Sequence, residues 1–303
     1  KSITCMNITD FNGTNIDENL VVIRVSGDDA SSFLQGQFSN NVELVSNEKY
    51  QYSTFSTNQG KVIGTFRLFS HEQSFLILIN TDVVDVFIDR LKKYIIMSKV
   101  EVEKIEINCL ASFGEEAKQY LDAEKIGQES NISVKDDNIL LDCSTSFYHS
   151  CFILSLDKDI PISKDYPISS KIKVGEFIDI INVFPRLHSK VQDTYIPQVL
   201  NMESHNAINY KKGCYTGQEI VARTHYLGKI KKILLLCSID NLENFAGNKI
   251  HNKNSEIVGE VITLEPITIE RVFFNAVIKL NSVEEELFLN KSSLKVHCFT
   301  ANP

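Results

Sequence analysis

Residues 210–223 read YKKGCYTGQEIVAR, and this stretch is the most informative part of the sequence. Two lysines and a glycine precede Cys214, and a helix is expected to follow from about Thr216 to Arg223. The positive end of a helix and nearby ammonium groups favour a thiolate, which is the better nucleophile and metal ligand. A buried cysteine in a glycine-punctuated loop is the alternative, and the residue pattern alone supports both interpretations equally.

The segment from Lys211 to Lys232 is locally basic within an acidic protein. It holds six Lys or Arg residues against one acid, Glu219, whereas the net charge of the chain is −8. This local charge suits an anionic small molecule with a carboxylate tail, or a phosphate backbone. The overall acidity argues against a general nucleic-acid coat protein, and any single lysine here is more typical of a solvated surface.

Length and composition indicate a globular protein of two or three units. The chain has 303 residues, of which 43% are hydrophobic and 23% charged, as in proteins that bury a normal core. The first ten residues lack an apolar signal-peptide core, and no apolar run approaches the length of a membrane span. Seven widely spaced cysteines fit a reducing compartment. We therefore expect a cytoplasmic protein with no membrane association.

Hydrophobic periodicity predicts mixed strands and helices in the first third of the chain. A helix is expected at 29–37, and another after Thr81 with an apolar face that reaches Ile95. Strands are expected at 20–25, 51–57, 61–69, 74–80 and 99–106. The turn at Asn58-Gln59-Gly60 suits a hairpin. This order favours α+β layers over a doubly wound parallel sheet.

The rest of the chain divides into further segments by composition. A β-rich unit with a short helix near 115–121 is expected after residue 107, followed by a polar connector at 155–173 and a helix at 173–183. After Gly228, short strands and turn residues continue to the end, including 231–237, 257–264 and 276–280. That pattern is typical of a small barrel or sandwich.

Residues 212–219, KGCYTGQE, closely resemble the K-G-C-[FY]-x-G-Q-E signature of the YgfZ-type folate-binding family, within the glycine-cleavage T-protein-like superfamily. Upstream, residues 33–37 are similar to its F-L-Q-G-Q segment, residues 60–69 to its G-K…R-L-F stretch, and residues 196–201 to its I-P-Q…N segment. The matches run from about 20 to 232, and residues 258–261 fit its C-terminal barrel. The resemblance therefore covers nearly the whole chain.

The resemblance implies an α+β fold of three lobes around a central cavity, with a small C-terminal β-barrel. Its units would be a folate-binding region at 1–106 plus about 174–228, a second α+β lobe at 107–173, and the barrel at 229–303. The family binds tetrahydrofolate or a derivative and supports assembly or repair of iron–sulfur enzymes, in a context that includes tRNA modification. The expected partners are folate and iron–sulfur client or assembly proteins, and nucleic acid is not expected to bind. The protein is expected to be a monomer.

The resemblance also implies which residues form the site. Cys214 would be the functional thiol, with its chemical role left open. Gln35, Arg67 and Gln198 would border the cavity. The full set of residues expected to bind the cofactor is Lys212, Gly213, Tyr215, Gly217, Gln218, Glu219, Gln198, Arg67 and Gln35. No metal site is expected, since the chain has no C-x-x-C and no H-x-x-x-H pair.

Two positions depart from the T-protein pattern. Gly64-Thr65 occupy the segment in which T-proteins carry aspartates that orient the reacting nitrogen of the folate. Without a carboxylate there, aminomethyl transfer is not expected. The glutamate with which T-proteins grip the pterin falls near Ile181, which cannot accept a hydrogen bond, although Asp179 or Asn182 could do so if the alignment shifts.

Three functions remain open at this point. The first is a tetrahydrofolate-binding accessory protein for iron–sulfur enzymes. The second is a folate-dependent one-carbon transferase or demethylase, against which the missing aspartates count. The third is an RNA- or protein-docking module that uses the basic 211–232 stretch and needs no folate, which a steep salt dependence of RNA binding would reveal.

Overall fold

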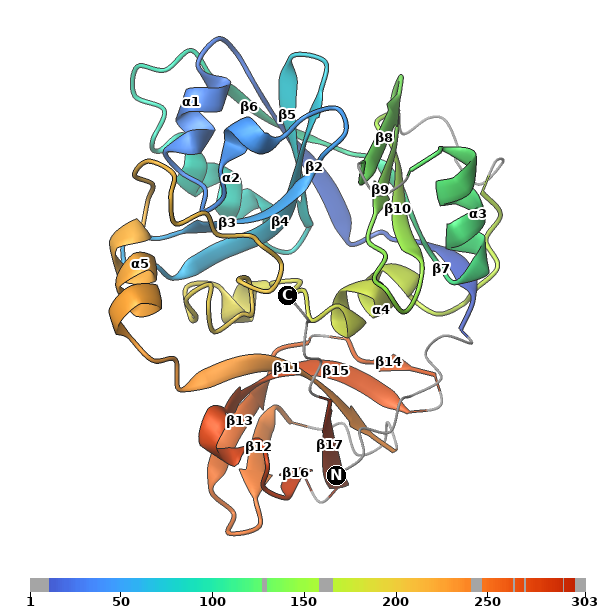
Figure 1. The fold of residues 1–303 in the computed structure, drawn as a ribbon, viewed down its shortest axis with the longest axis vertical. Helices are drawn as coiled ribbons and strands as arrows, with labels where there is room; N and C mark the ends of the chain where they lie inside the picture. Colours follow the sequence, from blue (N-terminus) through green and yellow to red (C-terminus); the bar gives the residue numbers. More distant parts are fainter. Residues whose placement is uncertain are drawn as a thin grey trace.

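The computed structural model describes residues 11–126, 130–157, 166–240, 247–263, 265–269, 271–290 and 292–297. Over these residues the chain forms three antiparallel sheets, each the basis of one lobe (Figure 1). None of the helices in this part of the chain is long and apolar enough to cross a membrane. Cys5, Cys298 and much of the connector predicted at 155–173 lie outside the described residues.

The first lobe is a sheet covered by two helices. Its strands lie in the order β3-β4-β5-β2-β6, and their bounds are β2 Leu20–Ser26, β3 Gln51–Ser56, β4 Val62–His71, β5 Ser74–Asn80 and β6 Glu101–Ile105. The helices are α1 (Ala30–Gln35) and α2 (Val84–Lys92), and both bury apolar side chains such as Phe33 and Phe87. The short η2 helix, Val42–Leu44, follows α1. The predicted strands and the hairpin turn at Gly60 are confirmed, with strand ends shifted by two residues at most.

The helix predicted after Thr81 is shorter than expected. The backbone N–H of Asp82 donates to the Asn80 side chain at 3.2 Å, which holds a turn before the helix begins. α2 starts at Val84 and ends at Lys92, so Ile95 follows the helix rather than extending it. Ile95 still packs against the buried residues of this lobe. The apolar periodicity was therefore a guide to burial, but not to the helix end.

The second lobe combines four consecutive strands with one strand from the start of the chain. The sheet order is β1-β7-β10-β9-β8, with β1 Gly13–Ile16, β7 Asn108–Phe113, β8 Ile132–Lys135, β9 Asn138–Asp142 and β10 Ser150–Ser155. The helix α3, Glu115–Ala123, covers it. β1 pairs with β7 in the register Gly13↔Phe113 to Ile16↔Leu110. Residues 13–16 thus join the sheet of the second lobe, not the first unit to which the prediction of 1–106 assigned them.

The third lobe is a closed barrel. Its strands are β11 Lys232–Ile239, β12 Lys249–Asn252, β13 Ile257–Val261, β14 Ile267–Thr268, β15 Val272–Lys279, β16 Leu287–Leu289 and β17 Ser292–His297, with the η6 turn at Leu280–Ser282. The order β11-β17-β16-β12-β13-β15 returns to β11 through the β11–β15 pairing, and β14 extends β15 on its other side. Of the two predicted alternatives, the barrel is therefore correct. Closure removes the unpaired strand edges that an open sheet would expose.

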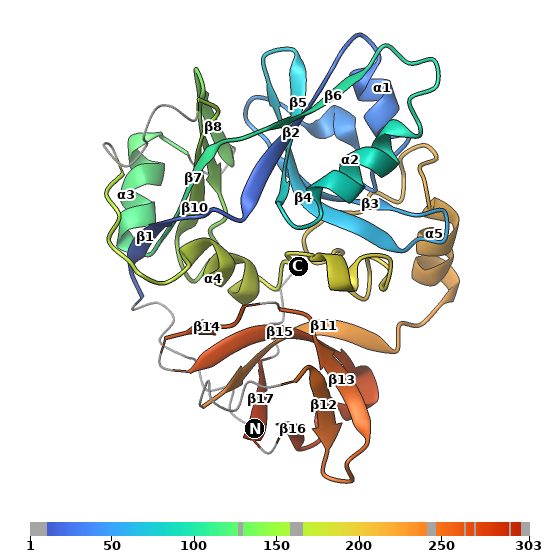
Figure 2. The same ribbon diagram turned by 180° about the vertical axis from the view of Figure 1, so that it is seen from behind.

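The helix α4, Val174–Ile181, joins the three lobes. It is buried almost along its whole length, and the largest apolar core contains residues from all three sheets. Phe177 packs edge-on against Phe113 of β7 at a centroid distance of 5.1 Å. Asn275 of β15 donates to the Ile180 carbonyl at 2.8 Å. Figure 2 shows α4 between the second lobe and the barrel, which explains why its residues other than Glu176 and Asp179 are apolar.

A buried charge network crosses the same junction. The guanidinium group of Arg67 on β4 lies 2.5 Å from the Asp179 carboxylate on α4, and both side chains are at most 2% exposed. Arg186 contacts the other Asp179 oxygen at 2.7 Å and Asp17 at 2.9 Å. Burial alone lowers the pKa of the Arg67 guanidinium, but Asp179 and smaller contributions from Cys143, Tyr52 and Tyr50 together outweigh it, and the pKa lies above its ordinary value. Three rings enclose the Arg67 guanidinium, those of Tyr52, Phe152 and Phe184.

We expect Arg67→Met to lower the free energy of unfolding by about 3 kcal/mol or more, because it leaves a buried carboxylate with one partner fewer. Urea denaturation followed by circular dichroism would measure the loss. Arg24→Met is the matched control, since the Arg24–Glu103 pair is at the surface and should cost about 1 kcal/mol or less. Equal losses in the two variants would contradict a structural role of the buried pair.

Candidate functional site

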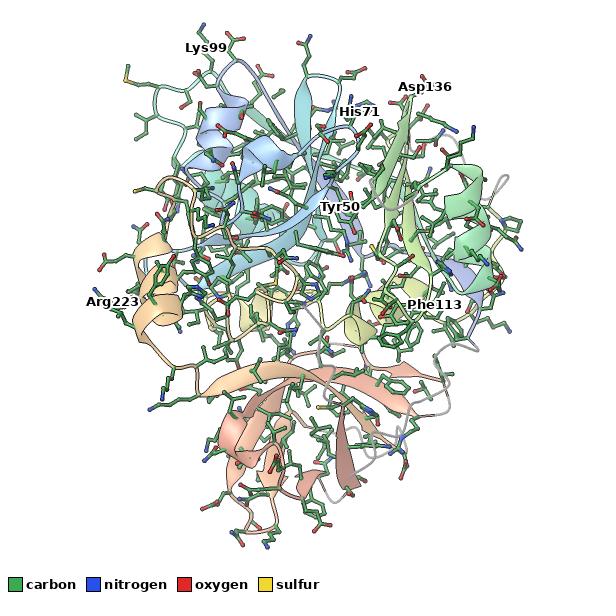
Figure 3. The ribbon with its side chains drawn as sticks, in the orientation of Figure 1. Tyr50, His71, Lys99, Phe113, Asp136 and Arg223 are labelled. Carbon is green, nitrogen blue, oxygen red and sulfur yellow. The ribbon has the colours of Figure 1, made fainter. Side chains whose placement is uncertain are left out.

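A cavity of about 610 Å³ lies where the three lobes meet. The first lobe contributes β3 and the residue before it, and the second lobe contributes Asn131, the end of β9 and the loop after it. The rest of the wall comes from the end of α4 and the two residues after it, Asn201, residues 204–206, β11 and the end of β17. Figure 3 shows Tyr50, one of the lining residues, at the boundary of the first and second lobes. The volume falls in the range of small-molecule and cofactor sites.

One part of the cavity wall is a cluster of two tyrosines and a thiol. The Tyr50 hydroxyl donates to the Asp142 carbonyl at 2.6 Å, and it lies 3.2 Å from the Tyr52 hydroxyl. Both hydroxyls are within hydrogen-bond distance of the Cys143 sulfur, at 3.4 and 3.8 Å. Burial raises the pKa of the Cys143 thiol. Cys143 is therefore a neutral, polarisable part of the wall, consistent with its prediction as a buried cysteine.

Another part of the wall offers neutral polar groups. Asn182 accepts from the Tyr148 hydroxyl at 2.7 Å and donates to the Cys143 carbonyl at 3.4 Å. The His205 imidazole packs on the Tyr52 ring at 5.2 Å, and burial lowers the pKa of His205 to about 4. At neutral pH the wall therefore presents an uncharged imidazole and amides. None of the residues that line this cavity is a lysine or arginine.

The two departures from the T-protein pattern lie in or beside the charged junction. Ile181 lines the cavity directly, with Asn182 next to it. An apolar side chain therefore occupies the position expected for the pterin-binding glutamate of T-proteins. Asp179 does not face this cavity; both its oxygens contact arginines, and it lines a separate cavity of about 300 Å³. The Thr65 hydroxyl donates to the Pro185 carbonyl at 2.5 Å. A side chain at Gly64 would meet the Phe87 ring at 2.7 Å, so no carboxylate fits there without rearrangement.

The signature segment forms a loop that is anchored on the first lobe. The helix that follows, α5, spans Gln218–Leu227, and Gly217 is its N-cap with a left-handed φ of 84°. Gly217 lies against the β3–β4 hairpin, where a Cβ atom would come within 2.5 Å of the Thr57 carbonyl oxygen. The backbone N–H of Thr216 donates to the Gly36 carbonyl at 3.1 Å. Segments 33–37, 57–60 and 214–220 thus pack together.

Three of the predicted site residues make contacts inside the protein that hold this loop and α5 in place, namely Lys212, Tyr215 and Gln198. The Lys212 ammonium donates to the Phe38 and Asn40 carbonyls at 2.7 and 2.9 Å, and burial lowers its pKa to about 8. The ammonium also lies 5.1 Å from the centre of the Tyr215 ring. Gln198 donates to the Val221 carbonyl at 2.7 Å and so holds α5. One of the lysines expected to favour a Cys214 thiolate is therefore engaged with backbone carbonyls.

Cys214 itself is exposed, so the alternative of a buried cysteine is wrong for this residue. Among the described cysteines, Cys109, Cys143, Cys151 and Cys237 are buried, and Cys214 alone is exposed. The neighbouring Gly213 is also exposed, and nothing lies within 4 Å of the position that its Cβ atom would take. Cys214 thus occupies an open position on a loop whose two ends are fixed.

The remaining predicted residues have local roles. The Gln35 side chain bonds Asn41 at 2.7 Å and the Val42 N–H at 2.9 Å, which shapes the turn after α1. Glu219 forms an exposed pair with Arg223 at 2.7 Å. The backbone N–H of Gln218 donates to the Tyr215 carbonyl at 3.1 Å, in the turn that begins α5.

The predicted site residues therefore do not form one site with the central cavity. Neither Cys214 nor any of the nine residues expected to bind the cofactor lines the 610 Å³ cavity. Gln35, Arg67 and Gln198, which were expected to border it, are instead used internally for a turn, an ion pair and a helix, and a role of these residues at a ligand stays a prediction. The residues that do line it, such as Tyr52, Cys143 and His205, lie far apart in the sequence, and no motif connects them.

Comparisons with known proteins place these features in context. No protein-family model matches the chain. The tRNA-modifying protein YgfZ of Buchnera aphidicola subsp. Baizongia pistaciae is 27% identical over 288 residues, which cover 90% of this chain and 89% of the relative. The protein of the same name from Hamiltonella defensa is 32% identical over 221 residues, 70% of this chain and 66% of the relative.

A solved structure shares the fold. The glycine cleavage system aminomethyltransferase T from Bartonella henselae aligns with a TM-score of 0.65 over 96% of this chain and 86% of its own. The sequence identity is 13%, so this likeness concerns the fold alone. It agrees with the α+β fold and the C-terminal barrel expected from the sequence.

We expect Gly217→Ala to lower the free energy of unfolding by about 2 kcal/mol or more, because the new Cβ atom adds left-handed strain and meets the Thr57 carbonyl. Chemical denaturation would give the difference. Gly213→Ala is the matched control, and its open surroundings should limit its effect to about 0.5 kcal/mol. A larger loss at Gly213 than at Gly217 would contradict the described anchoring of the loop.

Proposed function

Because this chain belongs to the YgfZ family within the glycine-cleavage T-protein-like superfamily, we propose that it binds tetrahydrofolate or a derivative in the central cavity and supports the assembly or repair of iron–sulfur enzymes. The observation that carries the proposal is the cavity of about 610 Å³, to which all three lobes contribute. The curated relatives are named tRNA-modifying proteins, and we extend that context to the enzymes that this chain would support.

The cavity fits the ring portion of a folate. Tyr52 and Tyr148 supply aromatic surface, while Asn182, His205 and Asn206 supply amide and imidazole groups that hydrogen-bond without charge. Ile181 provides apolar contact in place of the pterin-binding carboxylate of T-proteins. Since no lysine or arginine lines the cavity, the anionic tail of the folate would gain little there and would extend toward solvent.

Cys214 would act outside this cavity. It is exposed, it lies on a loop whose ends are held by Lys212 and Gly217, and it is absent from the cavity wall. An accessible thiol on a rigid loop suits contact with a partner protein, as in thiol exchange or transient metal ligation. We therefore assign folate binding and the thiol to two separate regions of the chain.

Aminomethyl transfer is not part of the proposal. The Thr65 hydroxyl donates to the Pro185 carbonyl, and Gly64 lacks a side chain, so neither position offers a general base. Asp179, which a shifted alignment would bring to the pterin-binding position, is committed to Arg67 and Arg186 and supplies no base either. The cytoplasmic location and the monomeric state expected from the sequence stay predictions.

Calorimetric titration with tetrahydrofolate under anaerobic, reducing conditions tests the first part of the proposal. We expect the unaltered protein to bind tetrahydrofolate saturably. In Ser204→Tyr the affinity should fall about tenfold, or ~1.4 kcal/mol, because the new ring occupies cavity volume. Ser31→Tyr on the exposed face of α1 is the control with the same substitution. No binding by the unaltered protein, or equal binding by both variants, would exclude the cavity as the folate site.

The role of Cys214 is tested separately with Cys214→Ser. Because the side chain is exposed, we expect the free energy of unfolding to change by about 0.5 kcal/mol at most, and folate affinity to stay unchanged. Iron–sulfur enzyme activity in a strain that lacks the gene should not be restored by this variant. Restoration to the level reached with the unaltered protein would rule out Cys214 as the functional thiol.

A further inference from the structure

The end of α5 and the adjoining barrel strands form a basic and aromatic surface. We call this the α5–β11 surface, and it consists of Arg223, Tyr226, Lys229, Lys231, Lys232 and Lys279. The side chain of Arg223 is 63% exposed, and Figure 3 shows it at the outer edge of the molecule. Tyr226 is 65% exposed, so its ring does not belong to the hydrophobic core.

The positive charge of this surface is only partly neutralised. Arg223 pairs with Glu219 one turn earlier on α5. Lys229, Lys231 and Lys232 are exposed, and no ion pair joins any of them to an acid in the described part of the chain. The protein as a whole carries a net charge of −8, so this concentration of cations runs against the average. An anionic partner would be attracted to this surface and repelled elsewhere.

Two of the lysines are cross-strand neighbours. Lys232 of β11 lies directly opposite Lys279 of β15, at the edge of the barrel closure. Like charges in this position destabilise a sheet. The Lys279 ammonium donates to the Ile257 carbonyl at 2.9 Å, which offsets part of the repulsion between the two lysines. An anion that contacts both lysines would remove the repulsion that remains.

Aromatic rings lie beside these charges. The Tyr210 and His225 rings stack at 3.8 Å with an interplanar angle of 16°, and Tyr226 meets His225 edge-on at 4.8 Å. Glu203 fixes the stack by accepting from the Tyr210 hydroxyl at 2.5 Å and from His225 at 2.8 Å. Tyr226 is thereby supported on a rigid base while much of its ring stays open to solvent.

We propose that the α5–β11 surface binds single-stranded RNA, with the lysines and Arg223 on phosphates and the Tyr226 ring stacked on a base. Unpaired cations beside an exposed aromatic ring are what a flexible nucleic-acid strand requires, whereas lysines are depleted in protein–protein interfaces. The overall charge of −8 confines such binding to this surface. The choice of RNA over DNA rests on the proposed link to tRNA modification; the surface itself is independent of folate binding.

Fluorescence anisotropy with a labelled oligouridine, competed by bulk tRNA, tests the proposal over a range of salt concentrations. With about four phosphate contacts, the logarithm of the affinity should fall against the logarithm of the salt concentration with a slope of roughly −3. Lys229→Glu/Lys232→Glu should weaken binding by at least about tenfold and flatten the slope. Tyr226→Ala should weaken it by about fivefold or more and leave the slope unchanged, because stacking is not ionic.

Lys118→Glu/Lys125→Glu, at exposed positions of the second lobe, is the control with the same charge change. It should bind RNA nearly as well as the unaltered protein, and all variants should keep their tetrahydrofolate affinity, so the two proposals fail separately. The inference is overturned by an absence of salt-dependent binding or by an equal loss in the control. Equal affinity for DNA of matching sequence, or for polyglutamate, overturns it as well, and the latter would mark a surface for an acidic protein.

Discussion

The buried pair of Arg67 and Asp179 is the constraint on which the arrangement of the three lobes depends. A guanidinium group at 1% exposure is tolerable only if its charge is compensated, and the carboxylate that does so lies on α4. Arg186 then extends the network to Asp17, between β1 and β2. Since α4 also packs on the second sheet and the barrel, the position of this one helix fixes the first lobe relative to the other two.

The shape of the central cavity follows from that network. Tyr52 packs against the Arg67 guanidinium on one side, and its hydroxyl group reaches the Cys143 sulfur on the cavity wall. Phe184, which also covers Arg67, packs on both Tyr52 and His205. The cavity is therefore bounded by rings that the ion pair holds in place. The nearest arginines, Arg67 and Arg186, do not line the cavity, because they are paired with Asp179 and Asp17.

The second region, the loop around Cys214, does not depend on the buried ion pair. The loop that carries Cys214 is held by backbone geometry, with Gly217 against the β3–β4 hairpin and the Lys212 ammonium on two carbonyls. Lys212 and Gly217 thus serve to fix the loop, while Cys214 stays exposed. Beyond it, α5 leads directly to the cations and rings next to the barrel. Cavity, thiol and basic surface are three separate regions of one chain.

The sequence by itself determined the elements of this protein and its family. Period-two and helical patterns predicted β2 to β6 and α4 to within two residues, because those patterns reflect burial on one neighbouring layer, whereas α5 ends four residues later than expected. The octapeptide 212–219 and three upstream segments indicated the family, and the exposed Cys214 stands in that octapeptide. The four-residue strand β1 was missed, since its partner β7 is about a hundred residues away and local periodicity contains no information on it.

Only the tertiary structure decided which side chains share a site. Arg67, Gln198 and Lys212 were expected at a ligand, but each donates to a buried partner within the protein, and nothing in the sequence distinguishes the two uses. Tyr52, Cys143 and His205 meet at the cavity because three sheets pack around α4. Their contacts span different lobes, and sequence patterns record only the local environment of each residue, so packing alone could bring them together.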